Sequence, residues 1–145
     1  MTPVPASSLE LPGIALVVFS GETDLGWLKI LKPGFRHCFA LLENHGRWVL
    51  FNPLSHKTEI TLIEGNVVFD LVGLFRNKGM KVVPWVIDPV GFKAAPLAPY
   101  TCVEAIKRIL GIHSPFIITP WKLYIFLKNK KIRLKPLTTE KILLN

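Results

Sequence analysis

FRHCFALLENHGRWVLFN, residues 35–52, contains two runs of strand-forming residues around the turn sequence ENHG. Asparagine, histidine and glycine all tolerate the positive φ angles that tight hairpin turns require. We therefore predict a β-hairpin whose two strands are residues 35–42 and residues 47–52. This hairpin is the best-defined element of the sequence, and the rest of the fold is built outward from it.

The register of the hairpin decides which side chains meet across it. If Asn44 and His45 form a two-residue loop, His37 lies directly opposite Asn52, and these two residues share one face. A longer loop, or a bulge at Gly46, makes the pairing diagonal or disrupts it. The first register is the one we expect.

Further strands and helices are predicted on both sides of the hairpin. Strands are expected at residues 13–19 (GIALVVF), 58–63 (TEITLI), 66–75 (NVVFDLVGLF) and 81–87 (KVVPWVI). Pro84 indicates that the last of these strands lies at a sheet edge or contains a bulge. Helices are expected within residues 20–34, at residues 101–112, and from residue 119 to about residue 130. Mixed strands and helices in this order indicate an α+β fold.

The composition fits one domain with one core. The chain has 145 residues, of which 50% are hydrophobic and 19% charged. We expect an extended N-terminal arm at residues 1–12, a single domain at residues 13–130, and a basic tail at residues 131–145. No apolar run reaches the length of a membrane span, and the N-terminus does not have the pattern of a secretion signal, so synthesis in the cytoplasm is expected.

Cofactors and metals are not predicted. The two cysteines are too few for a disulfide framework and lack the paired spacing of a zinc site. The sequence also has no phosphate-binding loop and no dinucleotide-binding motif. Free thiols are therefore the expectation for both cysteines.

Basic residues gather at the C-terminal end. The chain has a formal net charge of +8, and its last 24 residues hold seven basic residues and a single acid. Such a tail suits an acidic partner, and residues 122–135 (KLYIFLKNKKIRLK) are a candidate for binding nucleic acid. No aromatic residue follows Phe126, so the tail has no platform on which single strands could stack. A solvated face or a docking arm is the favoured interpretation.

The sequence TCVE, at the start of the predicted helix 101–112, has the form of a capping box. The Thr101 hydroxyl can cap the helix, and Glu104 can reach back to the Thr101 amide. Cys102 then lies in the first turn, where the helix N-terminus favours a thiolate and lowers the pKa from its ordinary value of about 8.5. Lys107, farther along, is expected to face solvent. Since cysteine is often simply buried, a structural role for Cys102 remains the alternative.

A thiolate becomes a catalyst when a histidine activates it and a third polar group orients that histidine. His37 is expected on a strand with the polar side chain of Asn52 opposite. The other histidines fall in a turn, in a loop, or beyond the far end of the helix: His45, His56 and His113. We therefore predict the triad Cys102, His37 and Asn52. Cys38 follows His37, points to the opposite face of the strand, and is expected in the core.

These motifs, FRHCFALLENHGRWVLFNP followed by PYTCVEAIKRILGI, resemble the circularly permuted branch of the papain-like thiol hydrolase superfamily. That branch includes cell-wall peptidase-like and lecithin:retinol acyltransferase-like proteins. In it, a histidine near the start of a strand precedes a helix whose N-terminal cysteine is the nucleophile, and His37 and Cys102 match these positions. Many permuted members have a histidine or a carboxylate as the third residue. Asn52 departs from this habit, so His56 and Glu59 remain alternatives.

The resemblance covers residues 13–110 and implies a papain-like fold in permuted order. The first functional hypothesis is a cysteine hydrolase that cleaves an amide or ester. Its favoured substrate is a peptide or cell-wall amide, and a lipid ester or acyl transfer is a variant. The second hypothesis is a non-catalytic protein of a phage particle or another large assembly, which docks through the arm and the tail. A nucleic-acid-binding module is a weaker third hypothesis, and a virion-associated hydrolase combines the first two.

Overall fold

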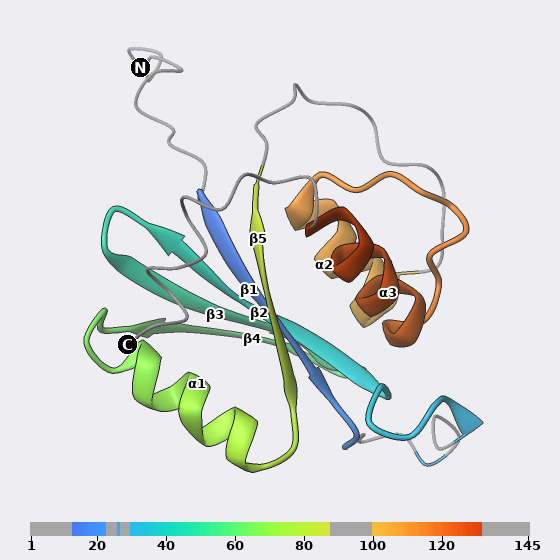
Figure 1. Cartoon of the computed structure of the whole chain (residues 1–145), viewed down its shortest axis with the longest axis horizontal. Coiled ribbons are helices and arrows are strands. Elements are labelled where there is room, and N and C mark those ends of the chain that lie inside the picture. Colours follow the sequence, from blue (N-terminus) through green and yellow to red (C-terminus); the bar gives the residue numbers. More distant parts are fainter. Residues whose placement is uncertain (1–12, 23–25, 27–29, 88–99, 132–145) are drawn as a thin grey trace.

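The computed structural model describes residues 13–22, 26, 30–87 and 100–131 (Figure 1). Its elements follow in the order β1 (Ile14–Ser20), β2 (His37–Asn44), β3 (Arg47–Pro53), β4 (Thr58–Ile63), α1 (Val68–Asn77), β5 (Lys81–Val86), α2 (Cys102–Leu110) and α3 (Pro120–Lys131). The predicted α+β class is confirmed. The predicted arm, almost all of the basic tail, and residues 23–25 and 27–29 of the short helix predicted within residues 20–34 lie outside the described residues.

The five strands form one antiparallel sheet in the order β4-β3-β2-β1-β5. β1 therefore lies inside the sheet, and every one of its residues from Ala15 to Phe19 is buried. β5 is an edge strand, as Pro84 predicted, because proline removes an amide that an interior strand would need. None of the helices in the described part of the chain is long and apolar enough to cross a membrane.

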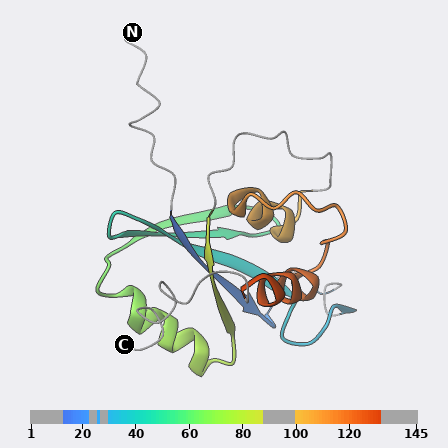
Figure 2. The ribbon, with the colours of Figure 1, turned by 45° about the horizontal axis from the view of Figure 1, so that its top comes forward.

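Helices cover the two faces of the sheet unequally (Figure 1, Figure 2). α1 lies on one face, and α2 and α3 lie together on the other. The core on the α1 face contains Leu16, Leu41, Trp48, Val68 and Val72. The larger core on the other face includes Phe19, Cys38, Val103, Ile106, Leu123 and Leu127. α2 and the strand β2 beneath it are therefore joined by the larger core.

The hairpin of β2 and β3 is confirmed, but its loop is one residue later than predicted. Asn44 pairs with Arg47, which leaves His45 and Gly46 as the loop. Their φ angles are 51° and 77°, and a two-residue hairpin turn with both residues at positive φ matches the twist of the strands. Histidine tolerates such an angle and glycine adopts it at no steric cost, so the pair His45 and Gly46 favours the turn at this place.

The later loop moves the pairing of the strands by two residues. His37 and Asn52 are therefore not directly opposite each other, as the first register predicted. Because side chains alternate with a period of two, a shift of two residues leaves every side chain on its predicted face. His37 and Asn52 still share a face and meet diagonally across the hairpin.

The prediction of a strand at residues 66–75 is wrong, because this segment forms α1. Its apolar side chains at positions i, i+3, i+4 and i+7 make one stripe that packs on the sheet: Val68, Leu71, Val72 and Phe75. Phe69 and Leu74, which lie off this stripe, are exposed. The valine-rich composition favoured a strand, whereas the helical period of the buried positions decides the structure.

α2 and α3 occupy the predicted segments. α2 ends at Gly111, whose φ of 73° is the left-handed conformation that commonly ends a helix. α3 begins at Pro120, and the Thr119 hydroxyl accepts a hydrogen bond of 3.2 Å from the Lys122 amide. Both helices thus begin at the start signals that their sequence contains, and α2 also ends at its stop signal.

Candidate functional site

The site lies where β2 and β3 separate. Pairing between these strands ends at Ala40 and Phe51, while His37 at the start of β2 pairs with Ser20 of β1. At the end of β3, Asn52 pairs with Glu59 of β4. The two strands therefore diverge at this end of the sheet, and the first turn of α2 reaches the start of β2 here.

Cys102, the first residue of α2, is half-buried, and its sulfur meets the beginning of β2. The Cys38 thiol, the Cys38 amide and the His37 ring all hydrogen-bond to this sulfur. Neighbouring residues in a strand point to opposite faces, yet His37 and Cys38 both contact the sulfur at this end of the sheet. The predicted partners Cys102 and His37 are thus brought together.

The His37 ring is held by Asn52. Nε2 of His37 lies 2.7 Å from Oδ1 of Asn52, which is the short distance of a strong hydrogen bond. On its other side, Asn52 donates from Nδ2 to Oε2 of Glu59 at 3.1 Å. Because the Glu59 carboxylate only accepts, the Asn52 nitrogen must face Glu59 and its oxygen must face His37.

This orientation also fixes the proton on the histidine. An amide oxygen only accepts, so Nε2 of His37 carries a proton and donates it to Asn52. Nδ1 is then the ring nitrogen that remains for the sulfur of Cys102. Asn52, the third residue of the predicted triad, is therefore in contact with His37.

Glu59 is the second alternative for the third residue, and it lies one hydrogen bond farther from the sulfur. Its Oε1 accepts an ion pair of 2.9 Å from Lys57. Hydrogen bonds from Lys57 and Asn52, together with the charge of Lys57, lower the pKa of the Glu59 carboxyl. Glu59 thus stays ionised and orients Asn52, while Asn52 contacts the imidazole.

His56, the first alternative, is exposed in the loop between β3 and β4, and its Nδ1 lies 3.5 Å from the Ser55 hydroxyl. His45 lies in the hairpin turn, and His113 follows the far end of α2. His37 is therefore the histidine that the fold brings to Cys102. Within the described ranges, no group of three histidine, cysteine or acidic side chains could hold a metal ion.

The environment of Cys102 favours its thiolate. The hydrogen bond from the Cys38 thiol is the largest cause, while burial opposes ionisation. The hydrogen bond and the charge of His37 and the Cys38 amide add to the first effect, and together they lower the pKa of Cys102 to about 5. The position at the start of a helix acts in the same direction. At neutral pH the sulfur is therefore a thiolate beside the charged His37 ring.

Cys38 has a role that the sequence did not reveal. It is fully buried in the core, as predicted, but its thiol also donates a hydrogen bond to the Cys102 sulfur. This bond, burial and the negative charge of Cys102 raise the pKa of Cys38 well above its ordinary value. In the sequence, the only indication of this contact was that Cys38 follows His37. Because neighbouring residues of a strand point to opposite faces, that indication argued against a contact with the same sulfur.

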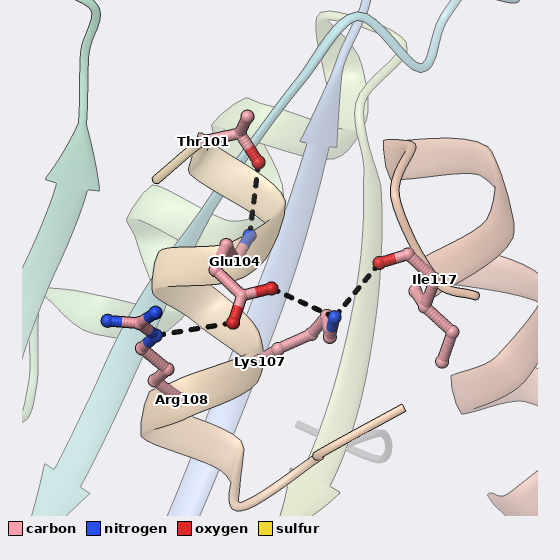
Figure 3. A network of polar contacts seen from close by, with 5 residues as sticks. All are labelled: Thr101, Glu104, Lys107, Arg108 and Ile117. Atoms are coloured by element: carbon pink, nitrogen blue, oxygen red, sulfur yellow. Dashed lines mark hydrogen bonds and ion pairs between the residues drawn. The ribbon is translucent and has the colours of Figure 1, made fainter. Parts of the chain in front are cut away.

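A buried network of polar contacts holds α2 in place (Figure 3). The Thr101 hydroxyl accepts a hydrogen bond of 3.3 Å from the Glu104 amide, as the capping box predicted. The Glu104 carboxylate, however, binds Lys107 at 2.9 Å and Arg108 at 3.2 Å instead of extending toward the Thr101 amide. Burial disfavours its charge, but the two cations outweigh burial and lower its pKa.

The prediction that Lys107 faces solvent is wrong. Its side chain is buried, and its Nζ also donates to the Ile117 carbonyl at 3.1 Å. Ile117 belongs to the segment between α2 and α3, so Lys107 ties this segment to α2 (Figure 3). A lysine this deep needs both partners, because an unpaired buried charge is strongly unfavourable.

Comparison with known proteins gives no relative for this arrangement: no family model, no curated protein and no solved structure matches the chain. The chemistry of the site therefore has to be argued from its own geometry.

Proposed function

We propose that the protein is a cysteine hydrolase that cleaves an amide or an ester through Cys102, His37 and Asn52. The observation that carries the proposal is the 2.7 Å hydrogen bond between His37 and Asn52, on a histidine that also contacts a cysteine at a helix start. A nucleophile, a base and a group that orients the base are the three parts that acyl transfer requires. A cysteine that only fills the core needs no oriented histidine.

In the first step the Cys102 thiolate attacks the substrate carbonyl carbon. His37, charged after taking the thiol proton, then donates a proton to the leaving amine or alcohol, and a thioester remains on Cys102. In the second step neutral His37 takes a proton from water, and the resulting hydroxide attacks the thioester. The acid leaves, and the thiolate and charged His37 are restored.

The start of α2 offers donors for the negative oxygen that forms during both steps. The first amides of a helix are not used by its own ladder of hydrogen bonds. In α2, the Glu104 amide is taken by Thr101 and the Ala105 amide bonds the Thr101 carbonyl. The amides of Cys102 and Val103 remain, next to the attacking sulfur, and they are the donors that we assign to the oxyanion.

The same residues support the resemblance to the permuted papain-like superfamily. An antiparallel sheet with the histidine strand before the cysteine helix in the chain agrees with that order. We extend the proposal to this fold, with a peptide or cell-wall amide as the favoured substrate and a lipid ester or acyl transfer as the variant. The assembly hypothesis depends on the two ends of the chain, and nearly all of these residues lie outside the described part.

The proposal is tested by trapping the thioester. The purified protein is incubated with a short-chain nitrophenyl ester, and with peptides and cell-wall fragments, and the products and the intact protein mass are followed. We expect release of nitrophenol and a transient acyl group on Cys102. In His37→Ala the acylation rate should fall at least about tenfold, since the base is absent.

His113→Ala is the matched control, because this histidine is exposed beyond α2, and it should leave acylation unchanged. Cys102→Ser removes the thiolate and should abolish the acyl adduct. If the acyl group forms at another residue, or if His37→Ala and His113→Ala behave alike, the proposal fails.

A further inference from the structure

The hydrolytic mechanism gives Cys38 no step of its own, yet this residue touches the nucleophile. It lies on β2 with its side chain in the core between the sheet and α2, and Cys102 packs against the same core. The Cys38 thiol donates its hydrogen bond directly to the Cys102 sulfur. Two cysteine sulfurs in direct contact are the starting point from which a disulfide can form.

The two cysteines differ in access. Cys38 is fully buried, whereas Cys102 is half-buried at the site. A small oxidant can therefore reach Cys102 first, and thiolates are the form of cysteine that hydroperoxides oxidise. Cys38 contacts Cys102 from inside the core, where a second thiol can act without contacting the oxidant.

We propose that Cys38 and Cys102 form a disulfide when a hydroperoxide oxidises Cys102, and that this bond reversibly blocks the nucleophile. The pair is thus a modification site that takes hydrogen peroxide or an organic hydroperoxide as its co-reactant. The inference rests on the thiolate that the proposed function also uses. It does not require that the protein hydrolyse any substrate.

The chemistry has two steps. The Cys102 thiolate attacks one oxygen of the hydroperoxide and the O–O bond breaks, which leaves a sulfenic acid on Cys102. The departing oxygen takes a proton from the charged His37 ring and becomes an alcohol or water. Cys38 then attacks the Cys102 sulfur and the S–O bond breaks. The departing hydroxide takes the proton that Cys38 loses and becomes water. Two electrons pass from the two sulfurs to the hydroperoxide.

The neighbouring thiolate explains why Cys38 becomes reactive only after the first step. A hydrogen bond to Cys102 and the charge of Cys102 are two of the three causes that raise the pKa of Cys38. Both depend on the negative sulfur, and a sulfenic acid carries no such charge at neutral pH. Oxidation of Cys102 thus removes the groups that kept Cys38 protonated, and burial alone remains. The His37 ring contacts Cys102 and is neutral after the first step, so it can relay the Cys38 proton to the departing hydroxide.

The test uses the full chain and hydrogen peroxide in slight excess, followed by mass spectrometry without reductant. In the wild-type protein we expect a mass lower by two hydrogens, a cross-linked peptide pair containing residues 38 and 102, and loss of iodoacetamide labelling at Cys102. Dithiothreitol should restore the labelling. No substrate is needed, so a protein that fails as a hydrolase can still pass this test, and the reverse also holds.

Cys38→Ala is the informative variant. Without the second thiol, the sulfenic acid should persist long enough to be trapped by dimedone and should then proceed to sulfinic acid, which dithiothreitol does not reverse. If wild-type Cys102 gains oxygen as this variant does, stays unmodified, or forms a disulfide only between two molecules, the proposal is overturned. Since Cys38 is in the core, the wild-type peptide map decides the question even if the variant does not fold.

Discussion

Nδ2 of Asn52 donates to Oε2 of Glu59 at 3.1 Å, and the two residues are direct partners across β3 and β4. This bond determines which end of the Asn52 amide faces His37. Glu59 in turn forms an ion pair with Lys57, which directly precedes the edge strand β4. The ion pair between Lys57 and Glu59 is thus connected to the His37 ring through two hydrogen bonds, from Glu59 to Asn52 and from Asn52 to His37.

Replacing Glu59 tests this relationship. In Glu59→Ala the Asn52 amide can turn over, so that its nitrogen faces His37. The alkylation rate of Cys102 should then fall about fivefold, the effect of losing one hydrogen bond of about 1 kcal/mol. Glu59→Gln keeps an acceptor and should retain most of the rate. Glu64→Ala removes an exposed acid elsewhere and serves as the control. Equal rates in Glu59→Ala and Glu64→Ala would contradict the relationship.

The reactivity of Cys102 should depend on pH as a thiolate with a pKa of about 5 does. The rate of iodoacetamide labelling is expected to be constant around neutral pH and to fall as the pH passes below about 5, because the sulfur becomes protonated. An ordinary thiol would lose its reactivity already below about 8.5. Labelling at a series of pH values, with the modified residue identified by mass spectrometry, measures the midpoint.

Variants at the two donors should move this midpoint upward. The Cys38 thiol is the largest single cause of the lowered pKa, and His37 contributes both a hydrogen bond and a charge, so Cys38→Ala and His37→Ala should each raise the midpoint. His113→Ala, far from the sulfur along α2, should leave the midpoint in place. A wild-type midpoint near the value of an ordinary cysteine would show that the sulfur lacks these contacts.

The buried lysine of α2 should matter more to stability than its exposed neighbour. Lys107→Ala leaves the Glu104 carboxylate buried with one cation fewer, and breaking such a pair lowers the free energy of unfolding by about 3–5 kcal/mol. Arg108→Ala removes the partner whose side chain is 39% exposed, and about 1 kcal/mol or less is expected. Urea unfolding followed by tryptophan fluorescence compares them. Similar losses in both variants would argue against the buried pair.

Two glycines should respond in opposite ways to alanine. Gly46 has a φ of 77° in the hairpin turn, so Gly46→Ala should lower the free energy of unfolding by about 1–2 kcal/mol. Gly73 lies within α1, where an added Cβ meets nothing within 4 Å, so Gly73→Ala should raise it by about 0.5–1 kcal/mol. The same unfolding measurement checks both, and a stabilised Gly46→Ala would place the turn elsewhere.

The local signals of the sequence predicted the helix starts well. Thr101 and Thr119 cap the helices that their spacing indicated, and Gly111 ends the first of them. These helix starts and ends depend on residues only a few positions apart, so they can be recognised from the sequence alone. The segment that became α1 is the exception, because valine-rich composition and helical spacing favoured different structures there, and burial against the sheet decided between them.

Contacts between distant segments were harder to predict. The pair of His37 and Asn52 followed from strand alternation and survived a shift of the register, because that shift was even. The burial of Lys107 could not be predicted, since its second partner is the Ile117 carbonyl in the next segment. The bond from Cys38 to Cys102 likewise depends on where α2 meets the sheet, which no local pattern encodes.

The thiolate described at Cys102 also couples the fold itself to proton concentration. In the unfolded chain this cysteine titrates near its ordinary pKa, whereas in the folded chain it stays ionised down to a pH of about 5. Between these two values the unfolded chain binds the extra proton, so acid draws the equilibrium toward unfolding. The contribution of Cys102 to stability is complete above the unfolded pKa and disappears as the pH falls to about 5. The sulfur that we assign to catalysis is thereby also a structural anion of the native state.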